Sequence, residues 1–275
     1  MNNIGAFFLS FLLGYMVAIA IVKPILSMLK EQSFVAKNFA GIDIPIGAGL
    51  VLVVGIVISS LVWHTVIGSL SINFIYLLVG INLMALLGLI DDLAGDKTNK
   101  GLKGHLKLLL QGKLSTGGLK ALGGGFIALF LSLPYSNSIP ILILNAVIIA
   151  LAINFINLLD LRPGRAIKGF LFFIAMIIVA KGMAEASWLG LVIGVVIAYL
   201  PYDLKAVSML GDTGSNVLGI ILGATMIFSL GPYEKLIALA ALVIVHIYAE
   251  YYSISKLIEG TSFLRILDRF GRPLR

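Results

Sequence analysis

Cysteine is missing from the 275-residue sequence, and charged residues make up only 12% of it. Without cysteine the chain has no disulfide, no thiolate metal site and no cysteine nucleophile. The scarcity of charge and the 60% share of hydrophobic residues exclude a water-soluble domain of useful size. No basic residue precedes the first apolar run, as a cleaved secretory signal would require. We therefore expect residues 4–22 to remain as a membrane span.

Apolar runs recur along the whole chain, and each is long enough to cross a hydrocarbon core of about 30 Å. They predict an all-α, polytopic integral membrane protein of about nine transmembrane helices. Residues 1–275 are expected to form a single catalytic domain in the lipid bilayer. The predicted spans are residues 4–22, 46–63, 74–90, 117–133, 141–157, 167–180, 187–201, 216–230 and 236–254.

The basic residues are distributed unequally between the two faces that these spans define. Of the 20 Lys and Arg residues, only Lys181 and Lys235 fall on one face, and the other 18 fall on the opposite face. Loops rich in Lys and Arg stay in the cytoplasm. We therefore expect the N-terminus outside, the C-terminus inside and the functional face at the cytoplasmic side of a bacterial plasma membrane. This asymmetry explains the net charge of +7 without a nucleic-acid partner.

Four carboxylates stand at the ends of predicted spans on the basic face: Asp91, Asp92, Asp160 and Asp212. Acidic groups at a membrane boundary repel one another unless a cation compensates them. Mg²⁺, or Mn²⁺ in its place, suits them, because Mg²⁺ takes oxygen ligands and shares them with substrate phosphates. The alternative interpretation is that these residues are topological stops and helix caps, with Asp212 capping the eighth span.

Amide and basic side chains accompany these carboxylates. Asn154 and Asn157 precede Asp160 at intervals of three residues, so the three lie near one face of a helix. Lys107 and Gln111 are one turn apart in residues 103–113, where Lys and Leu alternate at the spacing of an interfacial helix. A lysine at that place would offset phosphate charge.

Four blocks of sequence resemble the motifs of one enzyme superfamily. They are GLIDD at 88–92, KLLLQ at 107–111, NFINLLD at 154–160 and GDTGSNVLG at 211–219. In this order and spacing they resemble the polyprenyl-phosphate N-acetylhexosamine-1-phosphate transferases, or glycosyltransferase family 4. That superfamily includes the phospho-N-acetylmuramoyl-pentapeptide transferases of peptidoglycan synthesis and the enzymes that begin teichoic acid linkage units. The resemblance covers most of the chain.

The resemblance implies a magnesium-dependent phosphosugar transfer. A polyprenyl (undecaprenyl) phosphate oxygen would attack the diphosphate of a UDP-sugar, giving a polyprenyl diphosphate sugar and UMP. By the same resemblance Asp212 would be a metal ligand, together with Asn157. Asp91 or Asp92 would position or deprotonate the lipid phosphate. Relatives of this kind also imply a homodimer.

The resemblance further implies residues that contact the substrates. Lys107 would steady a phosphate, with Gln111 one turn away. Asn154 and Asp160 would line the nucleotide side of the site. Two residues before the second span are further candidates for a substrate contact: Lys37 and Asn38.

Two departures from the family pattern point to a divergent branch with an altered donor. After Asp160 the family usually reads Gly-Leu-Asp-Gly, whereas this chain reads LRPG at 161–164, with Pro163 in place of an aspartate. The family also carries a histidine-rich motif in its last cytoplasmic loop, and residues 263–272 contain no histidine. Arginines could supply phosphate contacts instead, or could only anchor the topology: Arg162, Arg165, Arg265, Arg269 and Arg272.

Two other functions are compatible with the same spans. A transporter or lipid flippase would carry its charges near the middle of the membrane. Here the charges lie at the boundary, and only His246 lies deep within a predicted span. The second alternative is a catalytically inactive relative that still binds a lipid phosphate.

Overall fold

A computed structural model describes residues 3–95, 115–182 and 186–272 and confirms the all-α fold. Within these residues a helix lies at each of the nine expected spans. They are α1 (Asn3–Glu31), α2 (Leu50–Val62), α3 (Ile72–Ala94), α5 (Thr116–Ser132), α6 (Ile139–Leu159), α7 (Arg165–Lys181), α8 (Ala186–Leu204), α9 (Gly211–Ser229) and α10 (Pro232–Tyr251).

Shorter elements join or follow these helices. A π-helical turn, η1 (Trp63–Ile67), extends α2, and a 3₁₀ turn, η2 (Leu133–Tyr135), follows α5. Strands β1 (Val35–Lys37) and β2 (Asp43–Pro45) pair antiparallel, with Ala36 opposite Ile44. Two short helices end the described chain, α11 (Ile254–Gly260) and α12 (Ser262–Arg269).

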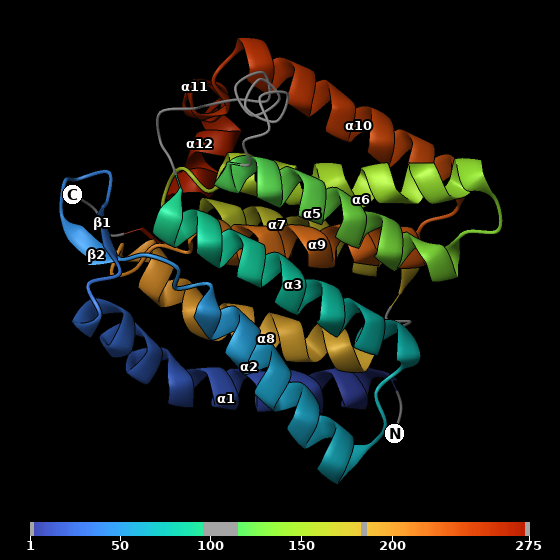
Figure 1. The fold of residues 1–275 in the computed structure, drawn as a ribbon, viewed down its shortest axis with the longest axis horizontal. Helices are drawn as coiled ribbons and strands as arrows, with labels where there is room; N and C mark the ends of the chain where they lie inside the picture. The colour runs from blue at the N-terminus through green and yellow to red at the C-terminus, as the bar shows by residue number, and fades with distance from the viewer. Residues whose placement is uncertain (1–2, 96–114, 183–185, 273–275) are drawn as a thin grey trace.

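The long helices lie side by side in one bundle, with α1 and α10 at its opposite margins (Figure 1). By length and composition, six of the helices in the described ranges can cross a membrane unaided: α1, α2 with η1, α3, α5 with η2, α6 and α10. Helix α9 runs through the middle, packed against α3, α6 and α7, and every residue from Thr213 to Ile227 is buried. The enclosed position of α9 explains how a helix with a polar first turn is held within the bundle.

Close backbone contact holds the central helices together. Apolar burial contributes little to helix association in lipid, so packing between small residues matters more. A Cβ atom added at Gly219 of α9 would lie 2.4 Å from the Cα of Ile153 in α6. The two helices therefore reach their separation only because residue 219 has no side chain.

Different elements lie at the two ends of the bundle. The β1–β2 hairpin, α11 and α12 lie at one end, and α1 begins at the other end (Figure 1). An ion pair between Lys181 and Glu234 joins the end of α7 to the start of α10 at that second end. This pairing agrees with the prediction that both residues share one face, away from the main basic face.

Three of the helix boundaries that differ from the predicted ones have a clear physical cause. Helix α1 runs through Lys23 and Pro24 to Glu31, because Leu26 and Leu29 on its continuation are buried. Helix α2 begins at Leu50 rather than 46, because the backbone of residues 45–49 pairs with that of Met209 and Leu210. Helix α9 begins at Gly211 rather than 216, because its first turn is held by another helix.

Candidate active site

Helices α3, α5 and α9 bring two of the predicted aspartates together around a lysine. The ammonium of Lys120 on α5 lies 2.8 Å from a carboxylate oxygen of Asp91 on α3. It lies 2.8 Å from a carboxylate oxygen of Asp212 on α9 as well. The lysine side chain is 20% exposed, so the three charges sit largely out of water. One cation therefore compensates two carboxylates that come from residues 121 positions apart in the chain.

Asp92 makes a different set of contacts from its neighbour Asp91. Its carboxylate accepts the backbone N–H of Asp212 at 2.7 Å and that of Thr213 at 2.9 Å. It also accepts the hydroxyl of Thr213 at 2.6 Å. These amides begin α9, where a helix has unpaired donors and a partial positive charge. Asp92 therefore caps α9 from another helix.

The start of α9 refutes the alternative interpretation of Asp212 as a helix cap. The N-cap position is Leu210, and Asp212 lies within the first helical turn. Sequence reasoning placed the cap locally because N-caps usually precede their own helix. Here the capping carboxylate is Asp92, 120 residues earlier. The carboxylate of Asp212 therefore does not cap the helix. It pairs with Lys120 and lines the neighbouring pocket.

A glycine permits this close approach of α3 to α9. A Cβ atom added at Gly88 would lie 2.5 Å from the carbonyl oxygen of Asp212 and 2.7 Å from the Cα of Thr213. Because Gly88 precedes Asp91 by three residues, it lies on the same side of α3. The small residue lets the paired aspartates reach the first turn of α9.

A pocket of about 260 Å³ opens beside the start of α9. Four carboxylates line it: Asp92, Asp160, Asp203 and Asp212. Among the described lining residues the basic side chain is Arg162, whose guanidinium lies over the ring of Phe39 at 5.5 Å from the centroid. Carboxyl groups therefore outnumber basic groups by four to one in the described lining.

Asp160 ends α6 and stands in this acidic lining. Burial raises the pKa of its carboxyl well above the ordinary value of 3.8, and the charges of Asp203, Asp212 and Asp92 raise it further. The backbone amide of Gly211 opposes this shift. Asn157, one turn before Asp160, also lines the pocket, and its side-chain amide oxygen accepts the hydroxyl of Ser215 at 3.2 Å. The end of α6 is thus tied to the first turn of α9.

A comparison with known protein families identifies the family of the chain. The profile of glycosyl transferase family 4 matches residues 74–230, more than half of the chain. The chain belongs to glycosyl transferase family 4. This confirms the resemblance to polyprenyl-phosphate sugar-phosphate transferases at the level of the family. No curated protein sequence matches the chain.

The range matched by family 4 runs from α3 to α9 and contains every carboxylate of the cluster. The β1–β2 hairpin and helices α10–α12 lie outside that range. Asn38 in the hairpin lines the pocket, and its side-chain oxygen accepts the amides of Ala40 and Ile42 at 2.9 and 3.1 Å. Asn38 therefore shapes the turn that closes one side of the pocket.

Other predicted site residues of this family 4 chain are placed away from the pocket or lie beyond the described residues. Asn154 is exposed on α6, and Lys37 is exposed on β1. Neither lines the pocket. Lys107 and Gln111 fall outside the residues that the structure describes, so their predicted roles stay predictions.

Sequence reasoning missed Lys120 and Asp203. Lys120 falls inside the predicted span 117–133, and a lysine within a span is costly without an acidic partner. This cost could have indicated, from the sequence alone, that Lys120 pairs with an acidic residue. Asp203 follows the span 187–201 as closely as Asp160 follows its own span. Its carboxylate is buried and accepts the N–H of Gly164 at 2.9 Å.

The oxygen donors of the site fit a magnesium ion that is shared with a substrate. Within the described ranges, no three acidic, His or Cys side chains gather closely enough to hold a metal by themselves. The carboxylate of Asp212 and the amide oxygen of Asn157 both lie at the pocket. Mg²⁺ often takes one or two protein ligands and completes its shell with water and phosphate oxygens. This family 4 site matches that mode better than a closed protein cage.

Proposed function

We propose that the protein transfers a sugar 1-phosphate of the N-acetylhexosamine type from a UDP-sugar to a polyprenyl phosphate. An oxygen of the lipid phosphate forms a bond to the sugar-linked phosphorus. The bond from that phosphorus to the bridging diphosphate oxygen breaks, and UMP leaves. The product is a polyprenyl diphosphate sugar, a precursor type for cell-wall and surface glycans.

The convergence of the motif aspartates supports this proposal most strongly. Asp91, Asp92 and Asp212 come from α3 and α9, yet they meet at one end of the bundle, next to the pocket. A lipid phosphate can enter such a site from the bilayer, while a nucleotide sugar enters from water. Because 18 of the 20 basic residues were assigned to this face, we place it in the cytoplasm.

The proposal gives the carboxylates separate tasks. Asp91 lies beside Lys120, so it is the better placed of the pair to orient the lipid phosphate or take its proton. Lys120 sits where it can balance the charge of an incoming phosphate. Asp92 fixes the first turn of α9 and thereby the position of Asp212. Asp160 and Asn157 face the donor from the end of α6.

Two anionic phosphates must approach one another in this reaction, so positive charge is required between them. A magnesium ion held by Asp212 and Asn157 would supply that charge and polarise the diphosphate. The protein side chains would orient the two substrates and shield the reacting phosphates from water. Such a counter-ion would also offset the repulsion between a nucleotide sugar and the ionised carboxylates of the pocket lining.

Release of UMP tests the proposal directly. Purified protein in detergent is mixed with undecaprenyl phosphate, Mg²⁺ and a panel of UDP-sugars, and UMP is measured. We expect release with at least one donor, and its loss in Asp212→Ala and after removal of divalent ions by EDTA. Asp43→Ala is the matched control, since Asp43 is an exposed carboxylate in β2. No release with any donor would overturn the proposed transfer, and solute counterflow in proteoliposomes would indicate transport instead.

A further inference from the structure

Helix α12 is attached to the bundle through one buried carboxylate, Asp268. Its oxygens accept hydrogen bonds from Arg165 at the start of α7, at 2.7 and 3.2 Å. They also accept two from Arg272, at 3.1 and 2.7 Å. Two guanidinium groups thus share one carboxylate that is 9% exposed. Paired geometry of this kind fixes orientation as well as distance.

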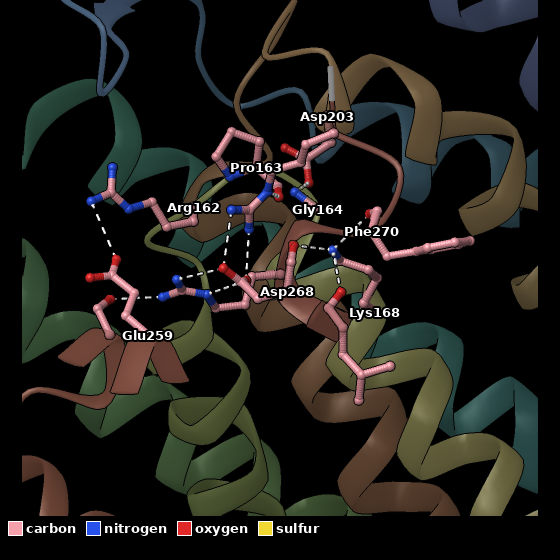
Figure 2. A network of polar contacts seen from close by, with 12 residues as sticks. Arg162, Pro163, Gly164, Lys168, Asp203, Glu259, Asp268 and Phe270 are labelled. Atoms are coloured by element: carbon pink, nitrogen blue, oxygen red, sulfur yellow. Dashed lines mark hydrogen bonds and ion pairs between the residues drawn. The ribbon is translucent and has the colours of Figure 1, made fainter. Parts of the chain in front are cut away.

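A lysine from α7 completes the attachment. The ammonium of Lys168 donates to the carbonyl oxygens of Leu267 at 3.0 Å and Phe270 at 3.2 Å (Figure 2). It also donates to the carbonyl of Asp268. The carbonyls of Leu267 and Asp268 belong to the last turn of α12, where carbonyls have no partner within the helix, and Phe270 follows that turn. Helix α12 is therefore held both by the side chain of Asp268 and by the carbonyl groups at its C-terminal end.

Arg272 extends this network to the wall of the pocket. Its Nε donates to the carbonyl oxygen of Pro163 at 2.7 Å. Pro163 and its neighbours Leu161 and Arg162 line the pocket, whereas Arg272 itself does not. In the same loop, Asp203 accepts the N–H of Gly164, whose φ of +73° suits glycine (Figure 2). The loop at residues 161–164 is thus held by hydrogen bonds from Arg272 and to Asp203.

We propose that Arg272 is a positioning residue that fixes the loop at residues 161–164, with α12 acting as the brace that holds Arg272 in place. The loop follows Asp160 and carries Arg162, the basic side chain of the described pocket lining. Asp268 and Arg272 lie beyond residues 74–230, the range that the family profile matches, so the brace is not part of the matched region. Its effect on the binding of a nucleotide sugar rests on the proposed function, whereas its effect on loop order does not.

The absence of cysteine allows a direct test of loop order. Leu161 is 61% exposed, so Leu161→Cys gives a single site for a nitroxide spin label in the full-length protein. We expect Arg272→Ala to increase the mobility of this label, seen as sharpened lines in its electron paramagnetic resonance spectrum. Arg269→Ala, which removes an exposed arginine of the same helix, should leave the spectrum unchanged. Equal spectra for the two variants would overturn the proposal.

A conservative variant separates the brace from general stability. Arg272→Lys keeps a donor for Pro163 but loses the paired contact with Asp268, so its label should be intermediate in mobility. If Arg272→Ala does not yield monodisperse protein, the comparison is made between Arg272→Lys and Arg269→Lys. A spectrum of Arg272→Lys that equals the Arg269→Lys spectrum would then refute the brace.

Kinetics test the consequence for the donor, on the unlabelled protein. We expect Arg272→Ala to raise the KM for the UDP-sugar about tenfold and to change kcat much less, since in the proposed reaction the loop would contact the donor and not the lipid phosphate. An unchanged KM beside a loosened label would overturn the link to donor binding. A loosened label in a protein without transferase activity would support the brace and count against the proposed function alone.

Discussion

The capping of α9 by Asp92 leads to a prediction that separates a structural carboxylate from a catalytic one. Asp92→Ala removes the acceptor of three hydrogen bonds, two from amides of the first turn and one from the Thr213 hydroxyl. Each buried donor left unpaired costs about 1–3 kcal/mol. Water reaches part of this site, so we expect the free energy of unfolding to fall by about 3 kcal/mol in total. This is the size expected for losing a strong N-cap together with a contact to the helix dipole.

This loss should appear in both stability and activity. A destabilisation of about 3 kcal/mol lowers the midpoint of thermal unfolding by about 6–12 °C in a chain of this size. If the same free energy displaces Asp212 in the active conformation, the rate falls about 10²-fold. The midpoint is followed by tryptophan fluorescence in detergent, and the rate by release of UMP. Asp43→Ala serves again as the control.

Asp92→Asn provides the decisive comparison. Asparagine keeps one acceptor oxygen for the α9 amides, so it should recover part of the stability and part of the activity. A general base would behave differently, because Asn and Ala would then be equally inactive and both would unfold like wild type. Finding that pattern would refute the capping role of Asp92 and indicate that Asp92 acts as a general base.

Three further predictions concern the site and the attachment of α12. Gly88→Ala should lower both activity and the unfolding midpoint, because its methyl group would overlap the carbonyl of Asp212; equal behaviour to wild type would show that α3 can shift freely. Lys120→Met should destabilise the protein by about 2 kcal/mol, and added Mg²⁺ should raise its midpoint more than that of wild type, since Asp91 and Asp212 lose their shared cation. Burial raises the pKa of Asp268, but its two arginine partners outweigh this and hold the pKa below 3.8. The stability advantage of wild type over Asp268→Asn should therefore be complete above that pH and vanish as the pH falls through the folded-state pKa, as thermal melts across that range would show.

The sequence predicted the helices well because each apolar run has to satisfy the thickness of the bilayer. It predicted their ends less well, and the reasons are specific. The first span was predicted to end at residue 22, yet α1 continues through Lys23 and Pro24 to Glu31 because its next turns pack against the bundle. The start of α9 depends on Asp92, which is remote in sequence. Local patterns contain no information about such a partner.

The candidate site was predictable in its residue types but not in its pairings. The position of acidic residues at span ends identified Asp91, Asp92, Asp160 and Asp212 before any coordinates. Their partners follow from how α3, α5 and α9 approach one another, which depends on packing and not on periodicity. The separate tasks of Asp91 and Asp92 follow from geometry as well, since adjacent residues on a helix point about 100° apart.

The carboxylate-rich lining of the pocket has a thermodynamic consequence for its ligands. Asp92, Asp160, Asp203 and Asp212 line a pocket of about 260 Å³, so an anion entering alone would be repelled by those of the carboxylates that are ionised. A divalent ion entering alone would complete its shell with water in place of phosphate oxygens. In the proposed reaction each ligand would therefore improve the affinity for the other, and by reciprocity the two enhancements would be equal. Nucleotide and metal would load as one synergistic pair, and titrating either at fixed levels of the other would measure that coupling.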